Sequence, residues 1–155
     1  MIARSVPAKL KTFLSLDPRV KVRYIEAFAW LGCARLLLVA LPFRTVAPLL
    51  GAPMRETPAA GPIDRTGELY EVYETIRIAA GHTFWESKCL VKAIAAMKML
   101  ERRRIDSTLY LGTARDENGA MVAHAWLRSG SYYITGAEEK ERYAVVATFA
   151  KFSGG

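Results

Sequence analysis

A thiol and an imidazole are the two side chains of this sequence best suited to covalent chemistry. Cys89 falls in the first turn of a predicted helix, where unpaired backbone N–H groups and the positive end of the helix dipole favour a thiolate. Lys88 adds a neighbouring cation. His124 follows 35 residues later in the predicted strand VAHAWL, so its imidazole could take the thiol proton. The pair indicates nucleophilic catalysis by a cysteine.

Each of these residues also has a purely structural interpretation. Cys89 could be a small buried hydrophobe at the start of the apolar stripe that begins at Leu90, and His124 could be a hydrogen-bonded histidine of a strand. His82, in the segment GHTFW, competes with His124 as the base. Cys33 lies in an apolar helical segment, where burial disfavours a thiolate, and we interpret it as core.

Other common kinds of site find no support in the sequence. The two histidines and two cysteines lack the spacing of metal ligands, and no glycine-rich phosphate loop is present. We therefore expect no metal and no other cofactor. Three arginines at 102–104 close the predicted Cys89 helix, where they match its negative dipole end.

Length and composition predict one folded unit. The chain has 155 residues, 52% of them hydrophobic and 24% charged, which excludes a disordered protein. Its net charge of +7 permits acidic partners, but charge alone does not favour nucleic acid, and we expect no nucleic-acid partner.

Two cysteines far apart form no disulfide framework, and the basic start lacks the pattern of a signal peptide, so we expect a cytoplasmic protein. The apolar stretch Ala27–Phe43 is interrupted by Arg35 and predicts a buried helix rather than a membrane-associated one.

The elements that position the two candidate residues follow from periodicity and capping. Asp17 and Pro18 predict the start of a helix over 18–41, and a short helix is expected at 43–50. A proline-rich linker separates these from helices expected at 69–80 and 87–104. Four alternating segments then predict strands, at 108–114, 120–128, 131–135 and 143–149. We divide the chain into a helical N-terminal part, 1–60, and a core, 61–155, which together form one compact unit.

This order of elements predicts an α+β fold, in which the Cys89 helix packs on an antiparallel meander of about four strands. The meander also predicts a register. If Arg128 and Ser131 flank a two-residue turn, His124 lies opposite Thr135.

Several of these segments together resemble one family. The motifs are Trp85-x-Ser87-x-Cys89-Leu90, the arginine-rich helix end followed by Leu109-x-Leu111-Gly112, and His124-Ala125-Trp126. They are similar to the standalone leader peptidases of lasso-peptide biosynthesis, which have a transglutaminase-like, papain-like cysteine protease core. The likeness covers roughly 79–149, and a weaker one, at Arg35 and Leu41-Pro42-Phe43-Arg44, extends it into the N-terminal helices.

The resemblance implies removal of the leader from a ribosomally made precursor peptide. It makes Cys89 the nucleophile and His124 the general base and then the general acid. The backbone N–H of Cys89 is the candidate oxyanion donor. The partners it implies are the leader region of the precursor, a separate leader-recognition protein and an ATP-using cyclase.

The sequence departs from the family at the third catalytic position. The family has an aspartate about a dozen residues after the histidine, where this chain has Ile134, Thr135 and Gly136. Thr135 could orient the imidazole through its hydroxyl, and Glu138 or Glu139 could reach back from the following loop. Two alternative functions stay open: acyl transfer on the same Cys89–His124 pair, and a non-catalytic scaffold that holds precursor and cyclase.

Overall fold

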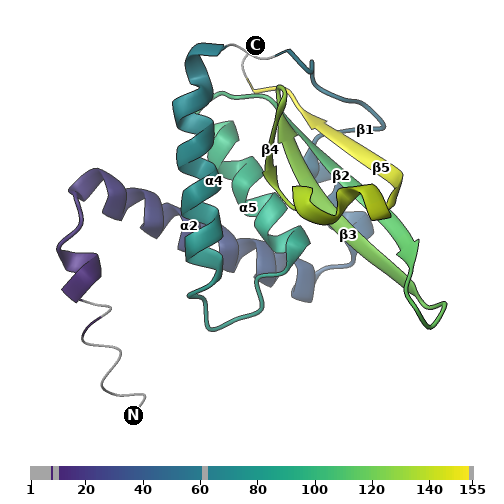
Figure 1. The fold of residues 1–155 in the computed structure, drawn as a ribbon, viewed down its shortest axis with the longest axis horizontal. Coiled ribbons are helices and arrows are strands. Elements are labelled where there is room, and N and C mark those ends of the chain that lie inside the picture. The colour runs from purple at the N-terminus through teal and green to yellow at the C-terminus, as the bar shows by residue number, and fades with distance from the viewer. Residues whose placement is uncertain (1–7, 9–10, 61–62, 154–155) are drawn as a thin grey trace.

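The fold is an antiparallel sheet with α2, α4 and α5 on one side of it (Figure 1). The computed structural model describes residue 8 and residues 11–60 and 63–153. The strands are β1 (Ala52–Pro53), β2 (Ser107–Arg115), β3 (Met121–Ser129), β4 (Tyr132–Thr135) and β5 (Ala144–Lys151). The α-helices are α2 (Pro18–Ala40), α3 (Phe43–Val46), α4 (Thr66–Ala80) and α5 (Cys89–Arg102). Short 3-10 helices are η1 (Ala47–Leu50), η2 (Ile63–Arg65) and η3 (Ala137–Arg142). The predicted α+β class is confirmed.

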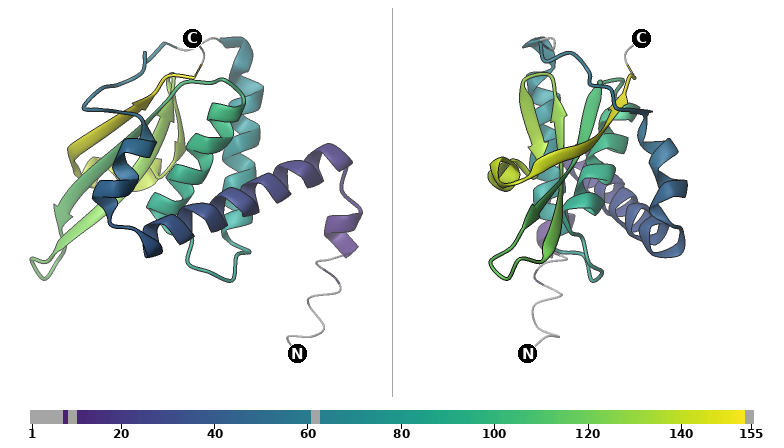
Figure 2. Two further views of the ribbon diagram at one scale, coloured as in Figure 1. Left: turned by 180° about the vertical axis from the view of Figure 1, so that it is seen from behind. Right: turned by 90° about the vertical axis from the view of Figure 1, so that its right-hand side faces the viewer.

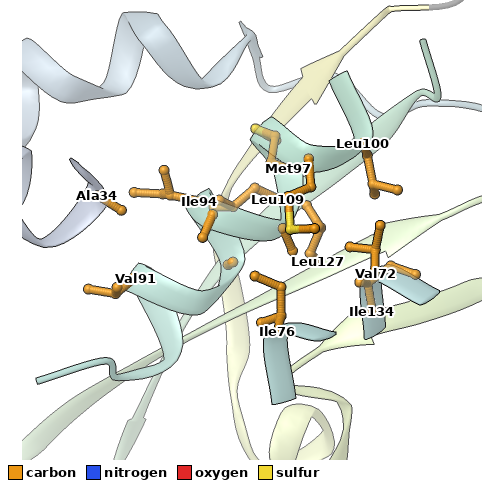
Figure 3. Packing of buried hydrophobic residues seen from close by; sticks show 14 of the residues in the cluster. Ala34, Val72, Ile76, Val91, Ile94, Met97, Leu100, Leu109, Leu127 and Ile134 are labelled. Atoms are coloured by element: carbon orange, nitrogen blue, oxygen red, sulfur yellow. The ribbon is translucent and has the colours of Figure 1, made fainter. Parts of the chain in front are cut away.

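Helix α5 is the centre of the packing. It contacts β2, β3 and β4 on one side and α2 and α4 on others. Figure 2 shows α2 crossing α5 on the side away from the sheet. The core between them contains Ile94, Met97 and Leu100 from α5 together with Leu109 and Leu127 from the sheet (Figure 3). The sheet thereby fixes the helix whose first residue is Cys89.

Helix α2 begins as the sequence predicts. Asp17 accepts a hydrogen bond from the backbone N–H of Arg19 at 2.8 Å, and Pro18 occupies the first helical position. The prediction that Cys33 belongs to the core is wrong, because Leu31 and Ala34 turn inward and leave Cys33 exposed between them. In the described part of the chain, no helix is long and apolar enough to cross a membrane.

The arginines that end α5 hold α2 in place. Arg103 donates to both carboxylate oxygens of Glu26, at 3.0 and 2.9 Å, and Arg102 lies 3.0 Å from the same group. The Glu26 side chain is only 8% exposed. Its desolvation is offset by these charged partners, so two of the three arginines have a structural role beyond matching the helix dipole.

The sheet differs from the simple meander that the sequence predicts. Strands β2, β3 and β4 are consecutive neighbours, but β5 returns to pair with β2 on the opposite side, giving the order β1-β5-β2-β3-β4. The two-residue strand β1 lies in the segment expected to be a linker, and it extends the sheet at β5. A strand this short has no readable alternation, so the sequence pattern could not reveal it.

The predicted register of the β3–β4 hairpin is also wrong. Ser129 pairs with Tyr132, so Gly130 and Ser131 form the turn, and Gly130 has a φ of 58° at the first turn position. A bulge at Ile134 then shifts the pairing, and Thr135 lies opposite Leu127. Thr135 is therefore not the cross-strand partner of His124.

Candidate functional site

A pocket of about 260 Å³ lies beside the start of α5, and both candidate residues line it. One wall consists of Tyr73, Ile76 and Arg77 from α4 with Cys89 and Lys92 from α5. The other wall consists of His124 from β3 and the run 133–139, which includes the end of β4 and the start of η3. The fold thus brings Cys89 and His124 to one place, as their predicted elements suggested.

Cys89 is partly buried at the first position of α5. Lys88 precedes it in an extended conformation, and no side chain caps this helix end. The N–H groups of the first helical turn have no acceptor within the helix and are free to bind an electron-rich atom. Lys88 is mostly exposed and lies 3.1 Å from Glu86, whereas Lys92, one turn further along α5, lines the pocket with the thiol.

The His124 imidazole packs near two aromatic rings. Its centroid lies 5.0 Å from that of Tyr143 and 5.8 Å from that of Trp126. Gly112 lies opposite His124 on β2, where a Cβ atom would come within 2.7 Å of Tyr143 Cβ and 2.9 Å of the Trp126 ring. Glycine is therefore needed at position 112 to make room for these rings, which explains one residue of the motif noted in the sequence.

The imidazole reaches the pocket past the edge of β3. Ala125 and Leu127 point into the core under α5, so alternation directs His124 and Trp126 to the other face of the strand. Pairing with β4 covers β3 only from Leu127 onward, which leaves the edge at His124 to the loop that follows β4. Within the described residues, the thiol and the imidazole share the pocket without a hydrogen bond between them.

The group bound to the imidazole is a main-chain oxygen. His124 Nε2 lies 2.8 Å from the carbonyl oxygen of Gly136. Thr135 Oγ1 is buried and has no hydrogen-bond partner in the described part of the chain, and neither Glu138 nor Glu139 bonds the ring there. All three line the pocket, but in this structure none of them has the orienting contact expected of it.

The competing candidates lie elsewhere. His82 is exposed at the end of α4, where its Nδ1 lies 2.9 Å from the carbonyl oxygen of Ile78, and it does not line the pocket. Trp85 packs near Gly32 of α2, and Trp126 stacks on Tyr110 with centroids 5.5 Å apart. Among residues 11–60 and 63–153, no cluster of histidine, cysteine or carboxylate side chains is arranged to hold a metal ion.

Sequence reasoning missed three residues of the helical wall. Lys92 is three positions after Cys89 and therefore lies on the same side of α5, a spacing that could have identified it. Tyr73 and Arg77 are likewise one turn apart on α4. Arg77 donates to Glu74 at 2.7 Å, a hydrogen bond that raises the pKa of the guanidinium. Tyr73 and Arg77 lie beside Cys89 because of how α4 packs against α5, and local sequence patterns do not specify that packing.

Comparison with known families gives a match over most of the chain. A family model described as the transglutaminase-like superfamily matches residues 24–148. The matched region contains both walls of the pocket and begins inside α2. No curated protein and no solved structure matches the chain at a significant level.

Proposed function

The chain belongs to the transglutaminase-like superfamily, whose members include cysteine peptidases and transglutaminases, and on that premise we propose that it is a leader peptidase. Its substrate in this proposal is the precursor of a lasso peptide, from which it removes the leader. The observation that carries the proposal is the shared pocket, which both a thiol at a helix N-terminus and an imidazole line. The motif resemblance around these two residues supplies the substrate class.

The proposed reaction passes through a thioester. His124 takes the proton of the Cys89 thiol, and the thiolate attacks the scissile carbonyl carbon to form a C–S bond. The backbone N–H of Cys89 stabilises the oxyanion, an interaction worth about 3 kcal/mol in comparable sites. The C–N bond then breaks as the imidazolium gives its proton to the leaving amine. Water activated by His124 hydrolyses the thioester and restores the thiol.

Substrate binding must bring the reacting atoms together. Catalytic hydrogen bonds are often long before the substrate binds and shorten in the reactive complex. The pocket walls come from α4, α5 and the segment after β4, so a bound peptide would contact both residues at once. In this proposal the thiol and the imidazole approach each other transiently across the pocket of the free protein, and the bound peptide holds them at hydrogen-bond distance.

The proposed partners are the leader of the precursor, a separate leader-recognition protein and the ATP-using cyclase. The described elements pack into the α5 core and the sheet, and the proposal assigns leader recognition to a separate protein. We therefore expect weak cleavage by the isolated protein and faster cleavage when a leader-binding protein presents the precursor. Equal cleavage rates with and without the leader-binding protein would show that this partner is not needed and contradict that part of the proposal.

The test is cleavage of a cognate precursor, with its recognition protein present and the products identified by mass spectrometry. Wild type should release the leader, Cys89→Ala should not, and Cys33→Ala should cut normally because Cys33 lies outside the pocket. Equal cleavage by wild type and Cys89→Ala would identify the chain as a scaffold. An added primary amine separates hydrolysis from acyl transfer, because a transferase would join it to the new carboxyl end.

A further inference from the structure

A general base needs a group that orients its imidazole, and the group in contact with His124 is the main-chain carbonyl of Gly136. Within the described residues the ring has one hydrogen bond, from Nε2 to the Gly136 carbonyl oxygen at 2.8 Å. A carbonyl oxygen can only accept, so Nε2 carries the hydrogen and Nδ1 is the unprotonated nitrogen of the neutral ring. The contact therefore selects one of the two tautomers of His124.

We propose that the main-chain carbonyl of Gly136 acts as the third member of the catalytic group, in place of a side-chain carboxylate. The inference rests on the proposed function, in which His124 is the base. Nδ1 accepts the thiol proton, and the resulting imidazolium keeps its Nε2–H bond to Gly136 O. Gly136 is thus a positioning residue that acts through His124. A neutral oxygen also stabilises the imidazolium less than a carboxylate would, so the proton passes more readily to the leaving amine.

The backbone around Gly136 fits this role and excludes a side chain. Gly136 has a φ of 73° and a ψ of 14°, the left-handed region that glycine adopts without strain. A Cβ atom here would come within 2.5 Å of the Ala125 carbonyl oxygen, 2.9 Å of Trp126 Cβ and 3.1 Å of His124 Nε2. An aspartate at position 136, near where the resemblance places the family's carboxylate, would therefore overlap the Ala125 carbonyl oxygen and Trp126 Cβ and crowd the imidazole.

Nuclear magnetic resonance of the ring nitrogens tests the tautomer directly. We expect the neutral imidazole of His124 to carry its hydrogen on Nε2, both in wild type and in Cys89→Ala. His82 provides an internal reference of the opposite kind, because its Nδ1 faces the Ile78 carbonyl oxygen at 2.9 Å. Thr135→Val and Glu138→Gln should leave the His124 tautomer unchanged. A hydrogen on Nδ1, or a rapidly averaging mixture, would overturn the proposal.

A pair of glycine variants tests the consequence for catalysis. Gly119 also has a positive φ, of 78°, but a Cβ atom there would meet nothing within 4 Å. Gly119→Ala should cleave the precursor at the wild-type rate. In Gly136→Ala the cleavage rate should fall about 10²-fold, the effect expected when a catalytic group moves by an ångström. Gly136→Ala should also lose the single Nε2–H tautomer and shift the pH profile of Cys89 alkylation. Gly136→Asp should be impaired as well, and increased cleavage by Gly136→Asp would overturn the proposal.

The tautomer and the activity report on separate claims. If wild type cuts no precursor but His124 has the Nε2–H tautomer, the proposed substrate is wrong and the orienting contact stands. If wild type cuts while His124 carries its hydrogen on Nδ1, the peptidase stands and the role of Gly136 is wrong. The measurement on the unsubstituted protein decides this even if Gly136→Ala fails to fold.

Discussion

At the scale of single residues, the proposed role of Cys89 as nucleophile makes its reactivity depend on His124, which another element brings to the same pocket. In a Cys33→Ser background, we expect His124→Ala to slow alkylation of Cys89 by iodoacetamide roughly tenfold at pH 7, because the thiol loses its proton acceptor. His82→Ala should have no such effect, since His82 does not line the pocket. Alkylation rates measured by mass spectrometry check this, and an unchanged rate in His124→Ala would contradict the assigned base.

The candidate nucleophile and base could be located from sequence, but the contact between His124 and the Gly136 carbonyl oxygen could not. A cysteine at a helix start and a histidine in a strand each give a local pattern, and the structure places both at one pocket. Every residue has a carbonyl oxygen, so no residue type marks the one at Gly136. Thr135 does not lie opposite His124 because the turn, at Gly130 and Ser131, comes one residue later than predicted, which alone would place Thr135 opposite Trp126. The bulge at Ile134 then moves Thr135 on to Leu127, and bulges leave no reliable signal in the residues around them.

At the scale of elements, the buried carboxylate of Glu26 joins α2 to the end of α5. Arg103→Ala should reduce the free energy of unfolding by roughly 3 kcal/mol, because the buried Glu26 carboxylate then loses its bidentate hydrogen bonds. Arg102→Ala is the matched control: it removes a 63% exposed arginine from the same carboxylate and should cost less than about 1 kcal/mol. Urea denaturation of both variants measures this, and equal losses would contradict the difference assigned to burial.

A second link between elements predicts a dependence on pH. Burial raises the pKa of Glu101, but bonds from Lys98 at 3.2 Å and Lys151 at 3.4 Å outweigh it and hold that pKa below its ordinary 4.5. A carboxyl group with a lowered folded-state pKa stabilises the fold above pH 4.5, and this contribution is lost as the pH falls through the lowered value.

Glu101→Gln should therefore be less stable than wild type at pH 7, and the gap in melting temperature should close under acid. Glu117→Gln, at an exposed position in the turn after β2, is the control and should match wild type throughout. Thermal melts across this range would contradict the assignment if the Glu101→Gln gap stayed constant below pH 4.5.

Among the elements, those with strong local signals were predicted and those set by pairing were not. The start of α2, the amphipathic stripe of α5 and the four longer strands all appear within a few residues of their expected bounds. The position of β5 beside β2 and the addition of β1 depend on contacts between distant segments. Alternation of apolar and polar residues reveals that a strand exists, but it does not indicate which strands it pairs with.

At the scale of the whole molecule, one face of α2 is buried and the other is open. Leu31 is 0% exposed in the core, while Leu36, little more than one turn away, is 69% exposed. Leu31→Ala should cost about 2–5 kcal/mol of folding free energy, and Leu36→Ala should stay within about 0.5 kcal/mol of wild type. Chemical denaturation distinguishes the two, and a large loss in Leu36→Ala would show that the apolar stretch is buried on both sides.

The packing also explains how the molecule positions its chemistry. Helix α5 is anchored along its length by the sheet, α2 and α4, so its first residue is held on a rigid support. The opposite wall comes from a short edge strand and the 3-10 turn after it, which are attached to the sheet at fewer points.

The central claim is that Cys89 forms a thioester with the substrate, and intact-protein mass spectrometry after an acid quench tests it most directly. In Cys33→Ser protein mixed with precursor and recognition protein, the chain should gain the mass of the peptide fragment that ends at the cut, less one water. Peptide mapping should place that fragment on Cys89. Leader release with no adduct at any time, together with equal release by Cys89→Ala, would contradict the account.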